Sequence, residues 1–145
     1  MKVVLQVVDK ASVEVEGKLH NSINKGYLLL VGINKGDSDE KVKEMAAKIS
    51  KLRVFKDENG KTNLNIYAVE GEILSISQFT LCANTVGTNR PDFCYAAPRD
   101  EAIRLYNLFN EELRKYDLIV KEGMFGEEMI VCLVNHGPFT LTLEV

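Results

Sequence analysis

The feature that most limits how this chain can fold is its series of short apolar runs, rich in β-branched residues, that alternate with tight-turn signals. The run at 2–9 opens the chain, and the runs at 11–15 and 27–33 end in turns that contain Gly17 and Gly36. Runs of this length predict strands, and glycine beside polar residues predicts the connections between them. We therefore expect an opening antiparallel hairpin followed by a buried strand.

Helical periodicity, in contrast, occurs in only two stretches. The first follows the capping residues Asp37 and Ser38, and its apolar residues recur every three or four positions, at Val42, Met45, Ile49 and Leu52. The second begins near Pro98, which suits a first helical turn, and its apolar stripe consists of Ala102, Tyr106, Phe109 and Leu113. We predict one amphipathic helix in each stretch.

Further strands are expected between and after these helices, at 53–55, 64–69, 73–81, 119–122, 129–135 and 139–145. Strands outnumber helices and do not alternate with them one for one, which disfavours a doubly wound parallel sheet. We predict an α+β fold: a largely antiparallel, barrel-like β-sheet with two packed helices.

Size and charge favour one domain that covers 1–145. A chain of 145 residues can bury enough apolar surface to fold without disulfide or metal staples. Its apolar runs are shorter than the roughly 18 residues of a membrane span, and its N-terminal stretch does not resemble a signal peptide. We therefore expect a cytoplasmic protein without a membrane partner. The net charge of −3 argues against a broad basic surface for DNA or RNA, so any nucleic acid must be held at a small site.

Metal and nucleophile chemistry have few candidate residues. Cys82, Cys94 and Cys132 share no C-x-x-C spacing, and we interpret them as reduced packing residues. His20 and His136 are too scattered for a zinc site, and only His136 could act as the base of a Ser or Cys nucleophile. We expect no metal and no cofactor.

Two short segments could hold chemistry. Residues 77–81, Ser-Gln-Phe-Thr-Leu, interleave hydrogen-bonding and apolar side chains at a predicted strand end, and 135–140, Asn-His-Gly-Pro-Phe-Thr, contain a Gly-Pro turn between two β runs. Taken singly, the first could be a solvated edge strand and the second an ordinary loop. The long segment 82–97, polar and without periodicity, is either flexible or functional.

Together, the two segments match the paired signatures SQ-x-TL and N-x-GP-x-T of the D-aminoacyl-tRNA deacylases, and the chain resembles that family from end to end. The resemblance extends to Ala-Ser-Val at 11–13, Asn-Arg-Pro-Asp-Phe at 89–93 and Gly-Met-Phe-Gly at 123–126. It implies a homodimeric hydrolase that cleaves the ester joining a D-amino acid, or glycine, to the CCA end of tRNA. It implies no cofactor.

The resemblance also implies how the amino acid is recognised. Gly137 and Pro138 would form a cis dipeptide that enters the partner subunit's site, where main-chain oxygens bind the substrate amino group and leave no room for an L side chain. Asn135 and Thr140, from the same motif, count among the substrate-binding residues, and His136 at its free position is expected to be a solvated turn residue. A backbone that reads chirality in this way would admit glycine.

Three further residues are implied to meet the RNA. Phe125 and Met129 resemble the family's apolar surface against the terminal adenine, although plain core packing would explain them as well. Arg90 could neutralise a tRNA phosphate or brace its own loop through a salt bridge.

The catalytic residues implied by the resemblance are Ser77, Gln78, Phe79 and Thr80. Thr80 has been assigned as the nucleophile in the family, but no carboxylate or histidine adjoins it in sequence. In the interpretation that we favour, the tRNA 2′-hydroxyl assists attack by water, and the backbone around Phe79 and Thr80 stabilises the oxyanion. Gln78 would then fix the adenosine or a neighbouring strand, and Ser77 would cap the local network.

Two positions depart from the family pattern. Val7 replaces an arginine that is credited with bracing the Gly-Pro loop, and Phe139 replaces a valine. A sister group without that arginine has the Gly-Pro bond in trans and acts on mischarged L-alanyl-tRNA, but it has a small residue where this chain has Phe79. The D-specific function is therefore our main prediction. The sister activity and a non-catalytic module that binds RNA ends or a protein are the alternatives.

Overall fold

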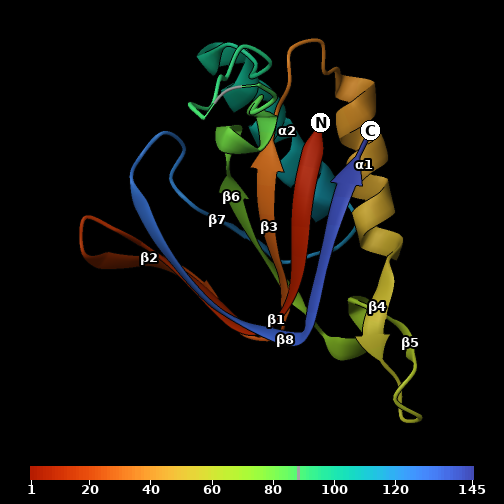
Figure 1. Cartoon of the computed structure of the whole chain (residues 1–145). Helices are drawn as coiled ribbons and strands as arrows, with labels where there is room; N and C mark the ends of the chain where they lie inside the picture. The colour runs from red at the N-terminus through yellow and green to blue at the C-terminus, as the bar shows by residue number, and fades with distance from the viewer. Residues whose placement is uncertain (88) are drawn as a thin grey trace.

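The structure is a computed structural model that describes residues 1–87 and 89–145. A strongly curved sheet forms its centre, and two α-helices pack together behind one face of that sheet (Figure 1). The strands are β1 Lys2–Val15, β2 Lys18–Ile23, β3 Gly26–Gly32, β4 Arg53–Lys56, β5 Thr62–Asn65, β6 Glu72–Ser77, β7 Val120–Glu122 and β8 Met129–Glu144. The α-helices are α1 Asp39–Lys51 and α2 Arg99–Arg114, and the short 3₁₀ helices are η1 Tyr67–Val69 and η2 Phe79–Cys82.

β1 organises the sheet because three other strands pair with it. Its first half pairs with β3, its second half pairs with β2, and β8 runs antiparallel along its other side over nearly its whole length. The strand order is β2-β1-β3-β6-β7, with β4 and β5 in a separate hairpin. β1 and β8 bend together at mid-length, which gives the sheet its barrel-like curve (Figure 1).

The predicted fold class is confirmed, with one refinement of the sheet. The pairs β3–β6 and β6–β7 are parallel, whereas every strand paired with β1 is antiparallel to it. The parallel pairs follow from long connections, since α1 and the β4–β5 hairpin link β3 to β6 and α2 links η2 to β7.

Both predicted helices are present with the expected buried faces, and α1 has the expected cap, whereas Pro98 is the N-cap residue just before α2 and does not lie in its first turn. The Ser38 side chain accepts a hydrogen bond from the Lys41 amide at the start of α1, and acidic residues fill the first turn. Buried residues of both helices share one core with some of the buried residues of β1 and β3, and this core includes Leu5, Leu29, Met45, Ile49, Tyr106 and Phe109. A second, smaller core lies inside the bend of the sheet and includes Val13, Leu28, Leu74 and Ile76.

Three strand predictions need correction. The strand expected at 64–69 ends at Asn65 and continues as η1, and the strand expected at 73–81 ends at Ser77 and turns into η2. η2 can turn there because Gly32 has no side chain: a Cβ at Gly32 would lie 2.9 Å from the Leu81 Cβ atom. The two strands expected at 129–135 and 139–145 are one strand, β8, interrupted by a bulge.

Candidate active site

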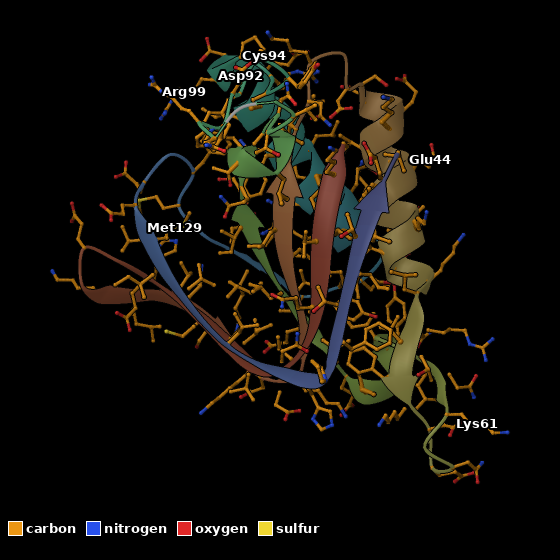
Figure 2. All side chains as sticks on the ribbon, in the orientation of Figure 1. Glu44, Lys61, Asp92, Cys94, Arg99 and Met129 are labelled. Atoms are coloured by element: carbon orange, nitrogen blue, oxygen red, sulfur yellow. The ribbon has the colours of Figure 1, made fainter. Side chains whose placement is uncertain are left out.

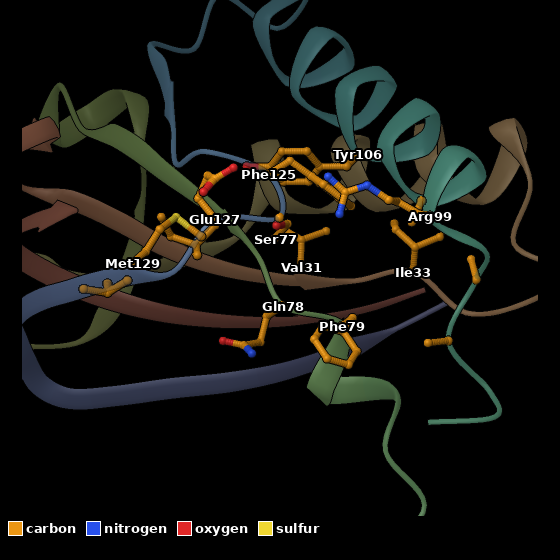
Figure 3. A pocket seen from close by; sticks show the side chains of 16 residues that line it. Val31, Ile33, Ser77, Gln78, Phe79, Arg99, Tyr106, Phe125, Glu127 and Met129 are labelled. Atoms are coloured by element: carbon orange, nitrogen blue, oxygen red, sulfur yellow. The ribbon is translucent and has the colours of Figure 1, made fainter. Parts of the chain in front are cut away.

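A pocket opens where β3 and β6 end. It has a volume of about 500 Å³, and its walls come from the ends of β3 and β6, η2, the start of α2 and the segment that leads into β8 (Figure 3). The lining is mainly apolar, with polar groups from Ser77, Gln78, Arg99 and Glu127. An apolar pocket with few polar groups is the usual form of a small-ligand site.

The SQ-x-TL segment divides between the pocket and the outer surface. Ser77, Gln78 and Phe79 line the pocket, and Phe79 is 57% exposed at its rim. The Gln78 amide donates a hydrogen bond to the neighbouring Thr80 hydroxyl. In the described part of the chain, Thr80 is exposed, does not line this pocket, and has no hydrogen bond to a carboxylate or an imidazole. The local contacts give its hydroxyl no base.

The turn into η2 leaves two backbone N–H groups without a partner in the helix: that of Phe79, which lines the pocket, and that of the next residue, Thr80. Leu81 N–H bonds to the Gln78 carbonyl and Ala83 N–H bonds to the Thr80 carbonyl, which are the first and last turns of the 3₁₀ helix. The amides of Phe79 and Thr80 precede the first of these bonds, so they have no partner within the helix. Two adjacent N–H groups of this kind can bind an oxyanion.

An aromatic wall forms the opposite side of the pocket. The rings of Tyr106 and Phe125 lie 5.8 Å apart, and the Tyr106 hydroxyl donates a 2.8 Å hydrogen bond to the Ser75 carbonyl. Burial raises the pKa of Tyr106 to about 12, so the hydroxyl remains a donor at neutral pH. Phe125 and Met129 both line the pocket, as a contact surface for a base requires, and Phe125 also packs against the main core.

The segment predicted at 82–97 includes residue 88, which lies outside the described residues, and the described parts on either side of it are held against this end of the molecule. Lys35 N–H bonds to the Tyr95 carbonyl, Ala97 N–H bonds to the Ile33 carbonyl, and Asn84 and Asp92 exchange a pair of backbone bonds. The Phe93 ring packs edge-on against Phe79 at 4.9 Å. Figure 2 shows Asp92, Cys94 and Arg99 at the end of the molecule where β6 ends, with Lys61 far away on the β4–β5 turn. Of the predicted RNA contacts, Arg90 is exposed in this segment and does not line the pocket.

The N-x-GP-x-T segment forms the bulge of β8. Asn135 pairs with Val8, Thr140 pairs with Gln6, and 136–139 lie between them without a partner in β1. The Asn135 side chain accepts a 2.8 Å bond from Phe139 N–H and donates a 2.9 Å bond to the Thr140 hydroxyl. The Gly137–Pro138 bond is cis, and both residues are exposed.

Neighbouring side chains hold the base of this bulge. His136 Nδ1 lies 2.9 Å from the carboxylate oxygens of Asp9 on β1, and the Gln6 amide donates a 3.3 Å bond to the Thr140 hydroxyl. His136, predicted as a solvated turn residue, is exposed but paired. Val7 is buried in the main core and supplies no charge to the bulge. In this chain, the polar contacts to the bulge come from Gln6 and Asp9.

The bulge and the pocket lie apart within one chain. Across β1, the bulge is level with the first residues of β3, at Gly26 to Leu28, whereas the pocket lies at the other end of β3 beyond Val31. Neither Gly137 nor Pro138 lines the pocket. One chain therefore does not bring together the two segments that the sequence predicts to work together.

The cysteine interpretation is partly wrong. Cys82 is buried, and burial raises the pKa of its thiol, as expected for a packing residue. Cys94 and Cys132 are exposed. Within residues 1–87 and 89–145, no group of three or more His, Cys, Asp or Glu side chains could hold a metal ion. No helix in that part of the chain is long and apolar enough to cross a membrane.

Sequence reasoning missed two pocket residues, Arg99 and Glu127. Arg99 directly follows the helix-initiating Pro98, and this position signals that its side chain lies at the start of α2. Glu127 precedes β8 in a stretch without periodicity, so the sequence offered no comparable signal for it.

The chain is similar to known proteins over nearly its whole length. Residues 4–144 match the family described as D-Tyr-tRNA(Tyr) deacylase. The D-aminoacyl-tRNA deacylase of Lactobacillus gasseri is 49% identical over 145 residues, which is 100% of both chains. That of an Exiguobacterium species is 52% identical over 144 residues, 99% of this chain and 98% of the relative.

Solved structures show the same fold. One, described as a c-Myc DNA Unwinding Element Binding Protein, is 42% identical with a TM-score of 0.93, and covers 100% of this chain and 99% of its own. Another, described as a probable eukaryotic D-amino acid tRNA deacylase, has a TM-score of 0.85 at 17% identity, and covers 99% and 98%.

Proposed function

The chain belongs to the D-Tyr-tRNA(Tyr) deacylase family, and on that premise we propose that it hydrolyses the ester of D-aminoacyl-tRNA and of mischarged glycyl-tRNA while sparing L-aminoacyl-tRNA. The observation that carries this proposal is the separation of an open pocket, rimmed by Ser77, Gln78 and Phe79, from an exposed Gly137-Pro138 bulge at the other end of β3. Each is half of a site that a second copy could complete.

A homodimer would join the two halves. β8 pairs with β1 on one side, and within the described residues its other side has no strand partner. Ile130 is 59% exposed and Val134 is 44% exposed on the outward face of β8. An edge strand with exposed apolar residues is a typical surface for pairing with another chain. These features support a dimer in which the bulge of one protomer enters the pocket of its partner.

Backbone groups of the bulge would then read the chirality of the amino acid. Carbonyl oxygens of Gly137 and Pro138 can accept hydrogen bonds from the substrate ammonium whatever the side chain is. A rigid bulge next to the α-carbon leaves space for hydrogen on one side only, so an L side chain clashes while a D side chain points outward. Glycine has no side chain to clash and would be accepted.

The reaction itself needs little from the protein. Water adds to the ester carbonyl, the two N–H groups at the start of η2 stabilise the oxyanion, and the tetrahedral intermediate expels the tRNA 3′-oxygen, which takes up a proton. The 2′-hydroxyl of the tRNA assists proton transfer, because the Thr80 hydroxyl is bonded to the Gln78 amide, which cannot act as a base. Thr80 is therefore a positioning residue in this proposal.

The terminal adenosine would lie against the wall that carries Phe125 and Met129. Both side chains line the pocket, and an aromatic ring beside a thioether offers a base an apolar surface for stacking. Asn135 and Thr140 would act indirectly, because they hold the bulge in shape and do not line the pocket. Arg90 lies outside the pocket, where it could meet tRNA beyond the terminal nucleotide.

The decisive experiment is amino acid release under multiple turnover from four substrates: D-Tyr-tRNA, L-Tyr-tRNA, Gly-tRNA and L-alanyl-tRNA charged on a non-alanine tRNA. We expect rapid release from the D and glycyl esters and intact L esters. Release from the L-alanyl ester would instead indicate the sister activity, and protection of every ester without release would indicate a binding module.

The dimer has a test of its own. Sedimentation of the pure protein should give a dimer, and Ile130→Glu, which places a charge on the outward face of β8, should give a folded monomer without activity. A stable, active monomer would contradict the completion of the site by a partner.

A further inference from the structure

The side chain of Arg99 occupies an unusual position at the pocket. It belongs to the first residue of α2 and lines the pocket beside Phe125 (Figure 3). Its guanidinium carbon lies 5.9 Å from the centroid of the Phe125 ring. A Cβ atom at Gly126 would lie 2.8 Å from the two terminal guanidinium nitrogens, so the group packs closely against the Gly126 backbone. A ring and a glycine therefore hold this cation in place.

The ion pairing of Arg99 differs from that of two other arginines of α2. Arg104 pairs with Asp39 at 2.7 Å, and Arg114 pairs with Glu122 at 2.5 Å. Within the described residues, Arg99 has no carboxylate within 4.0 Å. Its fork of N–H donors remains available, and such a fork fits a phosphate through two parallel hydrogen bonds.

Negative charges near Arg99 limit where a polyanion can bind. Asp100 follows it in the first turn of α2, Glu127 lines the same pocket, and the chain carries a net charge of −3. A polyanion cannot be attracted by this surface as a whole, because like charges repel it. Among the described residues, Arg99 is a cation beside the pocket without a carboxylate partner, so it can bind a phosphate there.

We propose that Arg99 binds the phosphodiester that joins the last two nucleotides of the tRNA acceptor end. The inference rests on the proposed function, in which the terminal adenosine enters the pocket along Phe125. The guanidinium lies over that same ring. The 5′-phosphate of the bound nucleoside is therefore placed next to Arg99, where the RNA chain extends out of the pocket. Arg99 is thus a substrate-binding residue that recognises RNA rather than the amino acid.

The test compares a substrate with the phosphate and one without it. Wild type, Arg99→Gln and Arg99→Lys are assayed on D-Tyr-tRNA and on 3′-O-(D-tyrosyl)adenosine, which lacks a phosphate. Arg104→Gln is the matched control, because it removes the same charge from the same helix at a site already paired with Asp39. We expect Arg99→Gln to raise the KM for D-Tyr-tRNA by about tenfold, as expected from a lost charge-assisted contact, with little change in kcat.

The KM advantage of the tRNA ester over the nucleoside ester should shrink by the same factor in Arg99→Gln, recover partly in Arg99→Lys and stay unchanged in Arg104→Gln. The slope of log kcat/KM against log salt should fall by about one unit or less, as for one lost phosphate contact. An unchanged KM for D-Tyr-tRNA, or an equal loss on both substrates, would overturn the proposal.

A binding measurement separates this proposal from the proposed function. If wild type hydrolyses none of the esters, the hydrolase proposal fails, and the affinity for a short oligoribonucleotide that ends in CCA still tests Arg99. Tenfold weaker binding by Arg99→Gln than by Arg104→Gln would support the phosphate contact. Equal affinity, or no binding by wild type, would overturn it.

Discussion

The pocket and the β8 bulge are built in different ways. The pocket takes its shape from packed elements, since Tyr106 is almost fully buried beneath it and Phe125 packs against the main core. The bulge is exposed, and a few hydrogen bonds from Asn135 and one glycine set its shape. The packed pocket is stabilised by many small contacts, whereas the bulge depends on each of a few hydrogen bonds. Single substitutions should therefore affect activity most in the bulge and stability most beneath the pocket.

Gly137→Ala should break the bulge most severely. Gly137 has a φ of +140°, and a Cβ atom there would lie 2.8 Å from the Phe139 nitrogen, so the Gly-Pro carbonyls must move. We expect kcat/KM for D-Tyr-tRNA to fall about 100-fold or more, the cost of misplacing binding groups by about 1 Å.

Gly60→Ala is the matched control for this substitution. Gly60 also has a positive φ, +74°, but a Cβ atom there meets nothing within 4 Å, and the residue lies in the distant β4–β5 turn. It should lose about 1 kcal/mol of stability and no activity. Equal activity of Gly137→Ala and Gly60→Ala would show that the bulge does not touch the substrate.

Asn135→Ala should weaken the bulge without changing its backbone freedom. It removes the bonds to Phe139 N–H and to the Thr140 hydroxyl. We expect about a tenfold lower kcat/KM and a loss of about 1 kcal/mol in the free energy of unfolding. Asn65→Ala, which removes a comparable bond to Ala68 N–H far from the site, should lose similar stability and keep full activity. A loss of stability without a loss of activity in Asn135→Ala would contradict the comparison.

Thr80→Ala tests whether a side chain or the backbone acts at the pocket rim. The substitution removes the hydroxyl and its contact with Gln78 but keeps the N–H groups at the start of η2. We expect kcat at saturating D-Tyr-tRNA to fall less than about tenfold. A fall of several orders of magnitude would instead make Thr80 the nucleophile.

Tyr106→Phe should have the smallest effect on catalysis at neutral pH and a clear effect on stability in alkali. The pKa of Tyr106 is raised from 10.0 to about 12 in the folded state, so its stabilising contribution is complete below pH 10 and is lost as the pH rises towards 12. The two-unit difference corresponds to at most about 2.7 kcal/mol.

Urea unfolding at pH 8, 10 and 11 measures this effect. The free energy of unfolding should fall with pH in wild type and fall less steeply in Tyr106→Phe, which also loses about 1 kcal/mol at pH 8 with the bond to the Ser75 carbonyl. The exposed Tyr95→Phe is the control. Burial raises the pKa of Tyr27 too, so a residual fall is expected. Identical slopes in the three proteins would refute the prediction.

The sequence predicted what depends on periodicity and missed what depends on local geometry. Both helices and most strands follow from apolar spacing, because a buried face must recur with the period of its element. The end of β6 at Ser77 was missed, since Phe-Thr-Leu suits a strand and the close approach of η2 to Gly32 cannot be read from spacing. The unbroken course of β8 was missed because Gly-Pro predicts a turn, whereas Asn135 bridges the bulge.

The candidate site, too, was predicted from the sequence only in part. The two motifs indicated Ser77, Gln78, Gly137 and Pro138, but spacing alone could not show that the two segments lie at opposite ends of β3. The position of Arg99 over Phe125 depends on how α2 meets the segment before β8, which is a long-range contact. The pair of Asp9 and His136 is equally invisible in sequence, since 127 positions separate the two residues.

The unbroken course of β8 has a consequence for how this protein can vary. Met129 in the pocket wall and Asn135 at the base of the bulge belong to the same strand, which fixes their separation at about 20 Å along an extended backbone. Losing or gaining one residue between them would turn every following side chain to the opposite face and shift the bulge relative to the pocket. The number of residues in this stretch therefore sets the position of the bulge relative to the pocket.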